Sequence, residues 1–166
     1  NERRGQTKIA IMTSNIKIIK INSEISSIIL NEPKTYNSLS FKNLIDLLKA
    51  LKKLDADNKV KVIIIEGAGK GFSAGHNLKE VRGLKKRDRY QKLFNLCSKV
   101  MLQIVEGRKP VIAKVHGAAF AAGCQLVASC DLAYSTKDAL FATPGVNIGL
   151  FCSTPMVAVS RKINRK

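Results

Sequence analysis

Two glycine-rich turns are the parts of this sequence best suited to chemistry, because each follows an apolar run typical of a buried strand. The first spans residues 67–75 (GAGKGFSAG) and the second spans residues 116–123 (HGAAFAAG). Small side chains let a ligand approach the backbone, and the start of a helix offers free N–H groups with a positive dipole potential. Two such turns can direct two N–H donors at one oxygen. That arrangement is an oxyanion hole, suited to the enolate or tetrahedral anion of a thioester, where each donor is worth roughly 3–4 kcal/mol.

Nucleotide-binding patterns fit the first turn poorly. A dinucleotide fingerprint starting at Gly67 would need glycine where Phe72 stands. A Walker A loop would need Ser or Thr after Lys70, and Gly71 follows it. A tight turn that binds no ligand remains an alternative.

The elements that must position these turns follow the α/β order ββαβ(α)βαβ. Residues 15–30 predict two strands joined by a turn at 22–24, and Ser40 is the expected N-cap of a helix ending near Leu54. The run 60–65 predicts a buried parallel strand, and a second helix is expected over 90–105. Residues 111–115 predict a further strand, 122–130 a buried helix, and 132–134 and 140–142 two short strands.

Composition indicates one globular domain with a strong positive charge. The chain has 166 residues, 45% of them hydrophobic, and 29 Lys+Arg against 12 Asp+Glu give a net charge of +17. Seven basic residues but only two acidic ones lie between residues 79 and 92. This stretch is either a site for phosphates, of a nucleic acid or of a phosphorylated cofactor, or a solvated lysine-rich surface. We expect no nucleic-acid partner, because no helix-turn-helix, RNA-recognition or zinc-finger pattern accompanies the charge.

Residues 139–160 form an uncharged stretch of 22 residues, long enough to cross a bilayer. Pro144, Gly145, Gly149 and Pro155 interrupt it, so we expect turns and short buried elements and no membrane span. The four cysteines form no CxxC pair and the two histidines no ligand-spaced cluster, which favours a reduced intracellular protein without a metal.

Four segments resemble, in the same order, motifs of the enoyl-CoA hydratase/isomerase, or crotonase, family. They are residues 31–40 (NEP…NSLS), 72–80 (FSAGHNLKE), 122–131 (AGCQL…CD) and 141–155 (FATPGVNIGLFCSTP). The last segment resembles one member of the family still more closely. The resemblance covers the chain from about Asn15 onward and implies an α/β crotonase (ClpP-like) fold, a spiral of ββα units.

The resemblance also implies a ligand, an acyl-CoA whose thioester oxygen meets the backbone N–H groups of His76 and Ala122. His76, Asn77, Leu78 and Lys79 would border the pantetheine, Ala74 would lie near the adenine end, and Lys34 would lie near the phosphates. The implied protein works in fatty-acid or related lipid metabolism and holds no permanent cofactor. Homotrimers or hexamers are expected for full-length members.

Two departures from the pattern bear on catalysis. Hydratases of this family use two glutamates to handle water and its proton, and Gln125 and Gly145 stand at those positions. Glutamine can orient water but cannot exchange a proton near neutral pH, and glycine offers no side chain. Each acid–base group contributes roughly 10²–10⁴-fold, so we expect no efficient hydration. A non-catalytic acyl-CoA-binding protein, or a partner subunit of a CoA-metabolising assembly, is the alternative.

Other chemistry-bearing side chains are expected to serve the scaffold. Glu80 should form a surface ion pair, Asp131 and His116 should be structural, and the His76 ring should be a bystander or a CoA contact rather than a catalyst. The cysteines should be buried small hydrophobes, with Cys124 the only one near the proposed hole.

Both ends of the sequence carry expectations of their own. Residues 1–14 are expected to be an N-terminal extension, and residues 15–166 a crotonase core that lacks the C-terminal helical part. We therefore expect the chain to expose apolar surface and to associate or fold poorly. Arg3, Arg4 and Lys8 hint at the mature edge of a transit peptide, so the mitochondrial matrix and the cytoplasm both fit.

Overall fold

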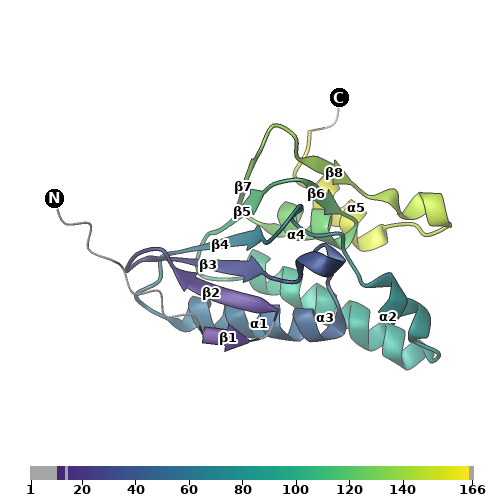
Figure 1. The fold of residues 1–166 in the computed structure, drawn as a ribbon, viewed down its shortest axis with the longest axis horizontal. Helices are drawn as coiled ribbons and strands as arrows, with labels where there is room; N and C mark the ends of the chain where they lie inside the picture. The colour runs from purple at the N-terminus through teal and green to yellow at the C-terminus, as the bar shows by residue number, and fades with distance from the viewer. Residues whose placement is uncertain (1–10, 14, 165–166) are drawn as a thin grey trace.

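The computed structural model describes residues 11–13 and 15–164, and it contains a six-stranded sheet in the order β1-β2-β3-β4-β5-β7 (Figure 1). The strands of this sheet are β1 (Ile11–Thr13), β2 (Ile16–Lys20), β3 (Ile25–Leu30), β4 (Val62–Gly67), β5 (Val111–Val115) and β7 (Leu132–Ser135). β1, β2 and β3 pair antiparallel, and β3, β4, β5 and β7 run parallel. The carboxyl ends of four strands therefore meet at one edge, where the loops that follow them lie together.

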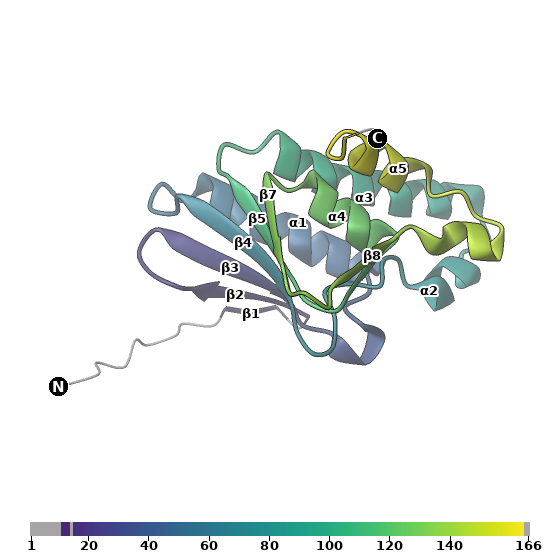
Figure 2. The same cartoon turned by 90° about the horizontal axis from the view of Figure 1, so that it is seen from above.

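Three helices cover one face of this sheet, as the two views show (Figures 1 and 2). They are α1 (Phe41–Ala56), α3 (Arg87–Val105) and α4 (Ala122–Ser129). Their apolar stripes bury residues such as Leu44, Leu47 and Val100 in one hydrophobic core with Ile63 and Ile65 of β4. The Ser40 hydroxyl accepts a hydrogen bond from Asn43 N at 3.2 Å, so the expected N-cap of the first helix is confirmed.

Short elements surround the ends of the parallel strands. They are a 3-10 turn η1 (Pro33–Thr35), α2 (Leu78–Gly83), the two-stranded parallel pair β6 (Ala118–Phe120) and β8 (Leu140–Ala142), a second 3-10 turn η2 (Pro144–Ile148), and α5 (Ser153–Ser160). β6 and α2 were not predicted. Both elements are too short to show a helical or strand periodicity in the sequence. In addition, β6 depends on pairing with β8, which begins about 20 residues further along the chain.

Several predicted boundaries differ from the observed ones, and two of them show why. The strand expected at 60–65 is β4 at 62–67, because its pairing with β3 begins at Ile25–Val62 and continues to Leu30–Gly67. The helix expected from residue 90 begins at Arg87. The prediction missed the first turn because its residues are charged and do not extend the apolar stripe. β1 lies within the expected N-terminal extension and pairs with β2, and residues 1–10 and 14 lie outside the described residues.

The stretch 139–160 differs most from expectation. It ends in the helix α5, where Pro155 fits because the first turn of a helix has no N–H partner to lose. Its large apolar side chains are mostly exposed rather than buried, as Ile148 and Phe151 illustrate at 65% exposure each. The expectation of exposed apolar surface is thereby confirmed. Within the described part of the chain, no helix is both long and apolar enough to cross a membrane.

Candidate functional site

The two glycine-rich turns lie side by side at the carboxyl edge of the parallel strands. Phe72 N and Ser73 N both donate to Ala118 O, at 3.0 and 3.1 Å, and Phe120 N donates to Ser73 O at 2.9 Å. Three backbone hydrogen bonds thus join residues 72–73 to 118–120, segments that lie far apart in the sequence. The turns form one rigid unit, not two independent loops.

The closest approach between the turns is at Gly75 and the start of α4. A methyl group added to Gly75 would lie 2.9 Å from Ala122 N, and the φ of Gly75 is +85°, which favours glycine. Gly123 is packed against the Ser73 backbone with no room for a side chain. The small residues noted in both turns are therefore required because the two backbones touch.

Two backbone N–H groups are left free at this contact. Leu39 N donates to Gly75 O at 2.7 Å in a parallel bridge between Leu39 and His76, so the N–H of His76 points away from Leu39. Ala122 is the first residue of α4, whose first N–H groups have no partner within the helix. Throughout residues 11–13 and 15–164, no acceptor is bonded to His76 N or Ala122 N.

Ala121 orients the second of these donors. Its φ is +49° and its ψ is −119°, a conformation that glycine adopts far more readily than alanine. Ala121 N donates to Ala142 O at 2.8 Å, which fixes the peptide against the end of β8. This strained residue directly precedes Ala122, so its conformation sets the direction of the Ala122 N–H.

The His76 ring braces the first turn. Its Nδ1 lies 3.2 Å from Leu39 O and, because a carbonyl oxygen only accepts, Nδ1 carries the proton. The ring also meets Phe94 of α3 edge to face, with 5.3 Å between ring centroids. Burial lowers the pKa of His76, so the neutral ring is favoured in the folded protein.

Side chains at the start of α5 lie beside Gln125 and Gly145, the two positions where hydratases of the enoyl-CoA hydratase/isomerase family carry glutamates. Gln125 is 6% exposed, and its Oε1 accepts a hydrogen bond from Thr154 Oγ1 at 3.2 Å. A methyl group added to the buried Gly145 would lie 2.6 Å from Cys152 Sγ and 2.5 Å from Leu150 O. The sequence did not indicate Thr154 or Cys152, because only the folded loop 145–152 brings them there.

The expectation for the cysteines was therefore wrong in one respect. Cys97, Cys124 and Cys130 are buried as predicted, whereas Cys152 is half-buried. Cys152 also lies close enough to Cys124 to raise the pKa of the Cys124 thiol, in addition to the larger effect of burial. Cys124, the neighbour of Gln125 in the sequence, therefore has a second thiol nearby.

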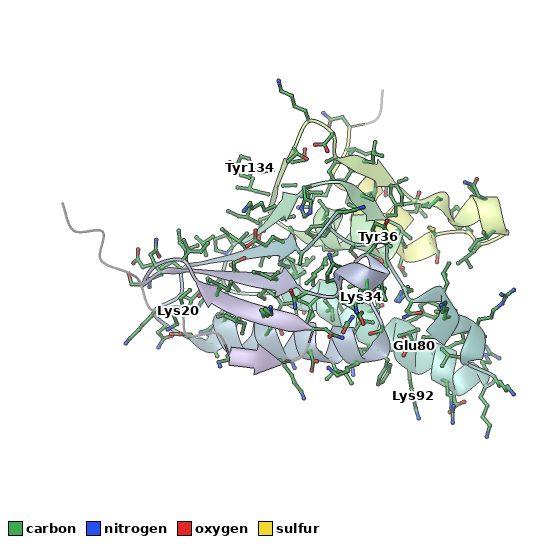
Figure 3. The ribbon with its side chains drawn as sticks, in the orientation of Figure 1. Lys20, Lys34, Tyr36, Glu80, Lys92 and Tyr134 are labelled. Atoms are coloured by element: carbon green, nitrogen blue, oxygen red, sulfur yellow. The ribbon has the colours of Figure 1, made fainter. Side chains whose placement is uncertain are left out.

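The residues expected to border coenzyme A lie around the first turn. Ala74 is exposed, and its N–H donates to Tyr36 O at 2.9 Å, which holds η1 with Lys34 against the turn. Figure 3 shows Lys34 and Tyr36 together on the side of the molecule that also carries Glu80. The start of α2 follows directly from His76, and its Leu78 is 60% exposed.

The side chain of Asn77 has a structural role. Its Oδ1 accepts hydrogen bonds from Lys79 N at 3.1 Å and Glu80 N at 3.2 Å, so Asn77 is the N-cap of α2. The Lys79 side chain is exposed. The structure thus gathers the expected contact residues around one turn, and it leaves their role toward a ligand as a prediction.

The scaffold expectations are confirmed for two residues and wrong for one. Asp131 Oδ2 accepts from Val111 N at 2.7 Å, and His116 Nε2 donates to Gly69 O at 2.8 Å, so both hold strands or turns together. Glu80 does not form the expected surface ion pair with any described residue. Its Oε2 accepts from Phe41 N at 2.9 Å, because the free N–H groups at the start of α1 attract a carboxylate.

The basic stretch covers α2 and the start of α3, where its side chains are largely exposed to solvent. Among the described residues, its one ion pair joins Lys92 Nζ to Asp88 Oδ2 at 4.0 Å. The described part of the chain contains no group of three His, Cys, Asp or Glu side chains placed to hold a metal ion.

Comparison with known proteins gives a consistent result. The family model described as enoyl-CoA hydratase/isomerase matches residues 20–166. Human enoyl-CoA hydratase domain-containing protein 3, mitochondrial, is 52% identical over 146 residues, which cover 86% of this chain and 47% of that protein. This is the member that residues 141–155 resemble, and its Xenopus laevis counterpart is 43% identical over 98% of this chain and 57% of its own length.

Solved structures agree with the sequence relatives. An enoyl-CoA hydratase from Mycobacterium smegmatis superimposes with a TM-score of 0.89 at 46% identity, covering 92% of this chain and 60% of that one. The human domain-containing protein 3 gives a TM-score of 0.85 at 47% identity, covering 89% and 58%. The predicted α/β crotonase fold is confirmed, and the chain spans about half the length of the curated relatives it matches.

Proposed function

Because the chain belongs to the enoyl-CoA hydratase/isomerase family, we propose that it binds an acyl-CoA thioester and polarises the thioester carbonyl without efficient hydration of an enoyl chain. The backbone N–H groups of His76 and Ala122 would donate to the thioester oxygen. The chain covers about half the length of its relatives, so the activity of the whole protein is part of this proposal.

The contact between Gly75 and Ala122 is the observation that carries this proposal. The separation of 2.9 Å between Ala122 N and a methyl group placed on Gly75 brings the residue before His76 into contact with the start of α4, which supports a shared role for the N–H groups of His76 and Ala122. Neither group is bonded within residues 11–13 and 15–164. Leaving a backbone N–H unpaired is costly, which supports an external acceptor shared by the two.

An acyl-CoA suits the surroundings of this contact. Lys34 and Lys79 offer positive charge to phosphates, and the exposed Leu78 offers apolar surface to the pantetheine. The remaining basic side chains of α2 and of the start of α3 would raise the local concentration of a polyanionic ligand. A nucleic acid could bind to the same positive charge. The two N–H groups without acceptors favour an acyl-CoA instead, because its thioester oxygen can accept from both.

The groups beside the proposed hole support weak or no hydration. The Gln125 side chain accepts a hydrogen bond from Thr154 and cannot act as a general acid or base near neutral pH, and Gly145 has no side chain. Losing two acid–base groups removes roughly 10⁴-fold or more in rate. An acyl-CoA-binding protein without turnover, or a partner subunit, is the second candidate, and the missing glutamates are the observation that favours it.

Compartment and assembly belong to the same proposal. The names of the human and frog relatives contain the word mitochondrial, so we place the protein in the mitochondrial matrix and in lipid metabolism. We expect a homotrimer or hexamer for a full-length form.

Two assays on the same preparation test the proposed function. Calorimetric titration with butyryl-CoA should give saturable binding, and free CoA should bind more weakly because it lacks the carbonyl. Crotonyl-CoA incubated with the protein should be hydrated at no more than a small fraction of an ordinary hydratase rate. Absence of butyryl-CoA binding would refute the acyl-CoA assignment, and rapid hydration would refute the proposed loss of proton handling.

A further inference from the structure

Residues 79–92 carry a dense group of positive charges, and we call this part of the surface the basic lobe. These residues form α2, the turn after it and the start of α3, and α2 lies at one end of the molecule in both views (Figures 1 and 2). Seven of them are basic and two are acidic, whereas residues 110–160 contain two of each. All seven basic side chains are exposed. The positive charge is therefore concentrated on one part of the surface.

The two acidic side chains leave most of this charge unbalanced. Glu80 is engaged with α1, where its Oε2 accepts a hydrogen bond from Phe41 N at 2.9 Å. Asp88 Oδ2 lies 4.0 Å from Lys92 Nζ, the one ion pair of the lobe among the described residues. Six basic side chains have no hydrogen bond or ion pair to any described residue: Lys79, Arg82, Lys85, Lys86, Arg87 and Arg89. Unpaired cations at this density attract an extended anionic partner.

Apolar side chains lie beside these charges. Leu78 begins α2 and is 60% exposed, and Phe94 of α3 is 42% exposed. A bilayer surface accommodates both kinds of side chain, because cations meet headgroup phosphates while apolar groups enter the boundary beneath them. A single-stranded nucleic acid would need aromatic rings that are free to stack on its bases. The Phe94 ring is instead packed edge to face against His76, with 5.3 Å between ring centroids, so a lipid surface fits better.

From these observations we propose that the basic lobe docks the protein on the surface of an anionic phospholipid bilayer without crossing it. Its lysines and arginines contact the headgroup phosphates, and Leu78 enters the headgroup boundary. The proposal goes beyond the acyl-CoA function and does not rest on it. Because α2 begins two residues after His76, docking also holds the proposed thioester site close to the lipid surface.

Vesicle flotation of the full chain tests the proposal, and it separates bound protein from self-associated protein, which does not float. At physiological ionic strength, vesicles of equal parts phosphatidylglycerol and phosphatidylcholine should bind at least about tenfold more tightly than phosphatidylcholine vesicles. About 1 M salt should remove this difference, because the Debye length is then about 3 Å. A fluorescent single-stranded RNA, titrated at physiological ionic strength, should bind more weakly than the anionic vesicles.

A charge-reversal variant of the lobe locates the contact. The triple change Lys85→Glu, Lys86→Glu and Arg89→Glu should weaken binding to the anionic vesicles at least about tenfold. Carboxylates suit the start of α3, because the helix dipole favours negative charge there. We therefore expect this variant to keep the melting temperature of the wild type, so that a loss of binding does not arise from unfolding.

The matched control lies on α1. The triple change Lys49→Glu, Lys52→Glu and Lys53→Glu alters the net charge equally, and these side chains are also exposed. They lie roughly 12–18 Å along the helix from Phe41, the residue that contacts Glu80 of the lobe. This distance exceeds the Debye length of about 8 Å, so the control should weaken vesicle binding by less than about threefold.

A change at Leu78 tests the apolar part of the contact. Leu78→Ala should weaken binding about threefold or more, because less apolar surface enters the boundary, and Leu102→Ala on α3, at 49% exposure, should not. Four outcomes would overturn the proposal: equal affinity for both kinds of vesicle, equal losses in the two triple variants, equal losses in the two leucine variants, and tighter binding of the RNA. No acyl-CoA is present in these assays, so their failure leaves the proposed function standing.

Discussion

Gly75 and Ala122 touch through their backbones, with only 2.9 Å between Ala122 N and the place that a side chain on Gly75 would occupy. The contact joins two turns that follow neighbouring parallel strands, β4 and β5. The next residue after Gly75 is His76, and among the described residues neither His76 N nor Ala122 N has an acceptor. The proposed chemistry depends on this contact, and so does the first of the predictions that follow.

Gly75→Ala should weaken both the fold and the binding of butyryl-CoA. The added methyl group would press on Ala122 N, and the φ of +85° is unfavourable for alanine, so we expect a loss of about 1–3 kcal/mol in the free energy of unfolding. Gly83→Ala is the matched control, because no atom lies within 4 Å of a methyl group there and its φ is not positive. Chemical denaturation and calorimetric titration measure both effects. Equal results for the two variants would contradict the contact.

Ala121→Gly should stabilise the protein. Glycine adopts the φ of +49° and ψ of −119° without strain, which we expect to raise the free energy of unfolding by about 1 kcal/mol. Ala128→Gly, within α4, should instead lose up to about 1 kcal/mol through backbone entropy. Denaturant unfolding compares the two. A loss of stability in Ala121→Gly would mean that the strain at this residue is not real.

Gln125→Glu should recover part of the missing hydration. A carboxylate at this position can accept the Thr154 hydroxyl as the amide oxygen does at 3.2 Å, and it can also exchange a proton. One acid–base group is worth roughly 10²–10⁴-fold, so the rate on crotonyl-CoA should rise by about 10²-fold and stay below that of a hydratase with both glutamates. Gln125→Asn is the control that changes length without adding charge. No rise in Gln125→Glu would place Gln125 away from the reacting carbons.

The contribution of His76 to stability should depend on pH. Burial holds the pKa of His76 in the folded protein below the ordinary value of 6.5, so the unfolded chain binds the proton more readily. The stability due to the neutral ring is therefore complete above pH 6.5. It decreases as the pH falls below that value toward the folded-state pKa. Denaturation of wild type and His76→Gln across this range should show the advantage of wild type shrinking at acid pH. A constant or growing advantage would contradict the neutral, braced ring.

Exposed apolar side chains near the C-terminus should make the chain self-associate. Ile148 and Leu150 are 65% and 53% exposed on neighbouring turns. Replacing both with lysine should lower the mean mass observed by sedimentation velocity at high protein concentration, because charge opposes burial of this surface. Leu102→Lys on α3, at 49% exposure, is the control on a different face. A wild-type chain that sediments as a compact monomer at every concentration would refute this prediction.

The sequence predicted what local patterns determine. Short segments rich in isoleucine, leucine and valine predicted β3 and β5, and Ser40 predicted the start of α1. It did not predict β6, whose alanines form a strand only because β8 and residues 72–73 lie beside them. The sequence likewise did not predict α2 or the first turn of α3, because their residues are mostly charged and form no apolar stripe.

The same distinction applies to the candidate site. Glycine-rich turns after buried strands suggested a pair of N–H donors, and the family motifs gave the residues. The places of Thr154 and Cys152 depend on the loop after Gly145, which folds back so that Leu150 N donates to Gly145 O at 2.9 Å. No spacing in the sequence encodes that return, so the thiol beside position 145 was visible only in three dimensions.

Infrared difference spectroscopy of butyryl-CoA labelled with ¹³C at the thioester carbonyl tests the central claim most directly. If His76 N–H and Ala122 N–H both donate to that oxygen, the carbonyl stretch moves to lower frequency when the ligand binds, and the shift is reduced in Gly75→Ala at saturating protein. A bound ligand whose carbonyl frequency equals that in water would contradict the account.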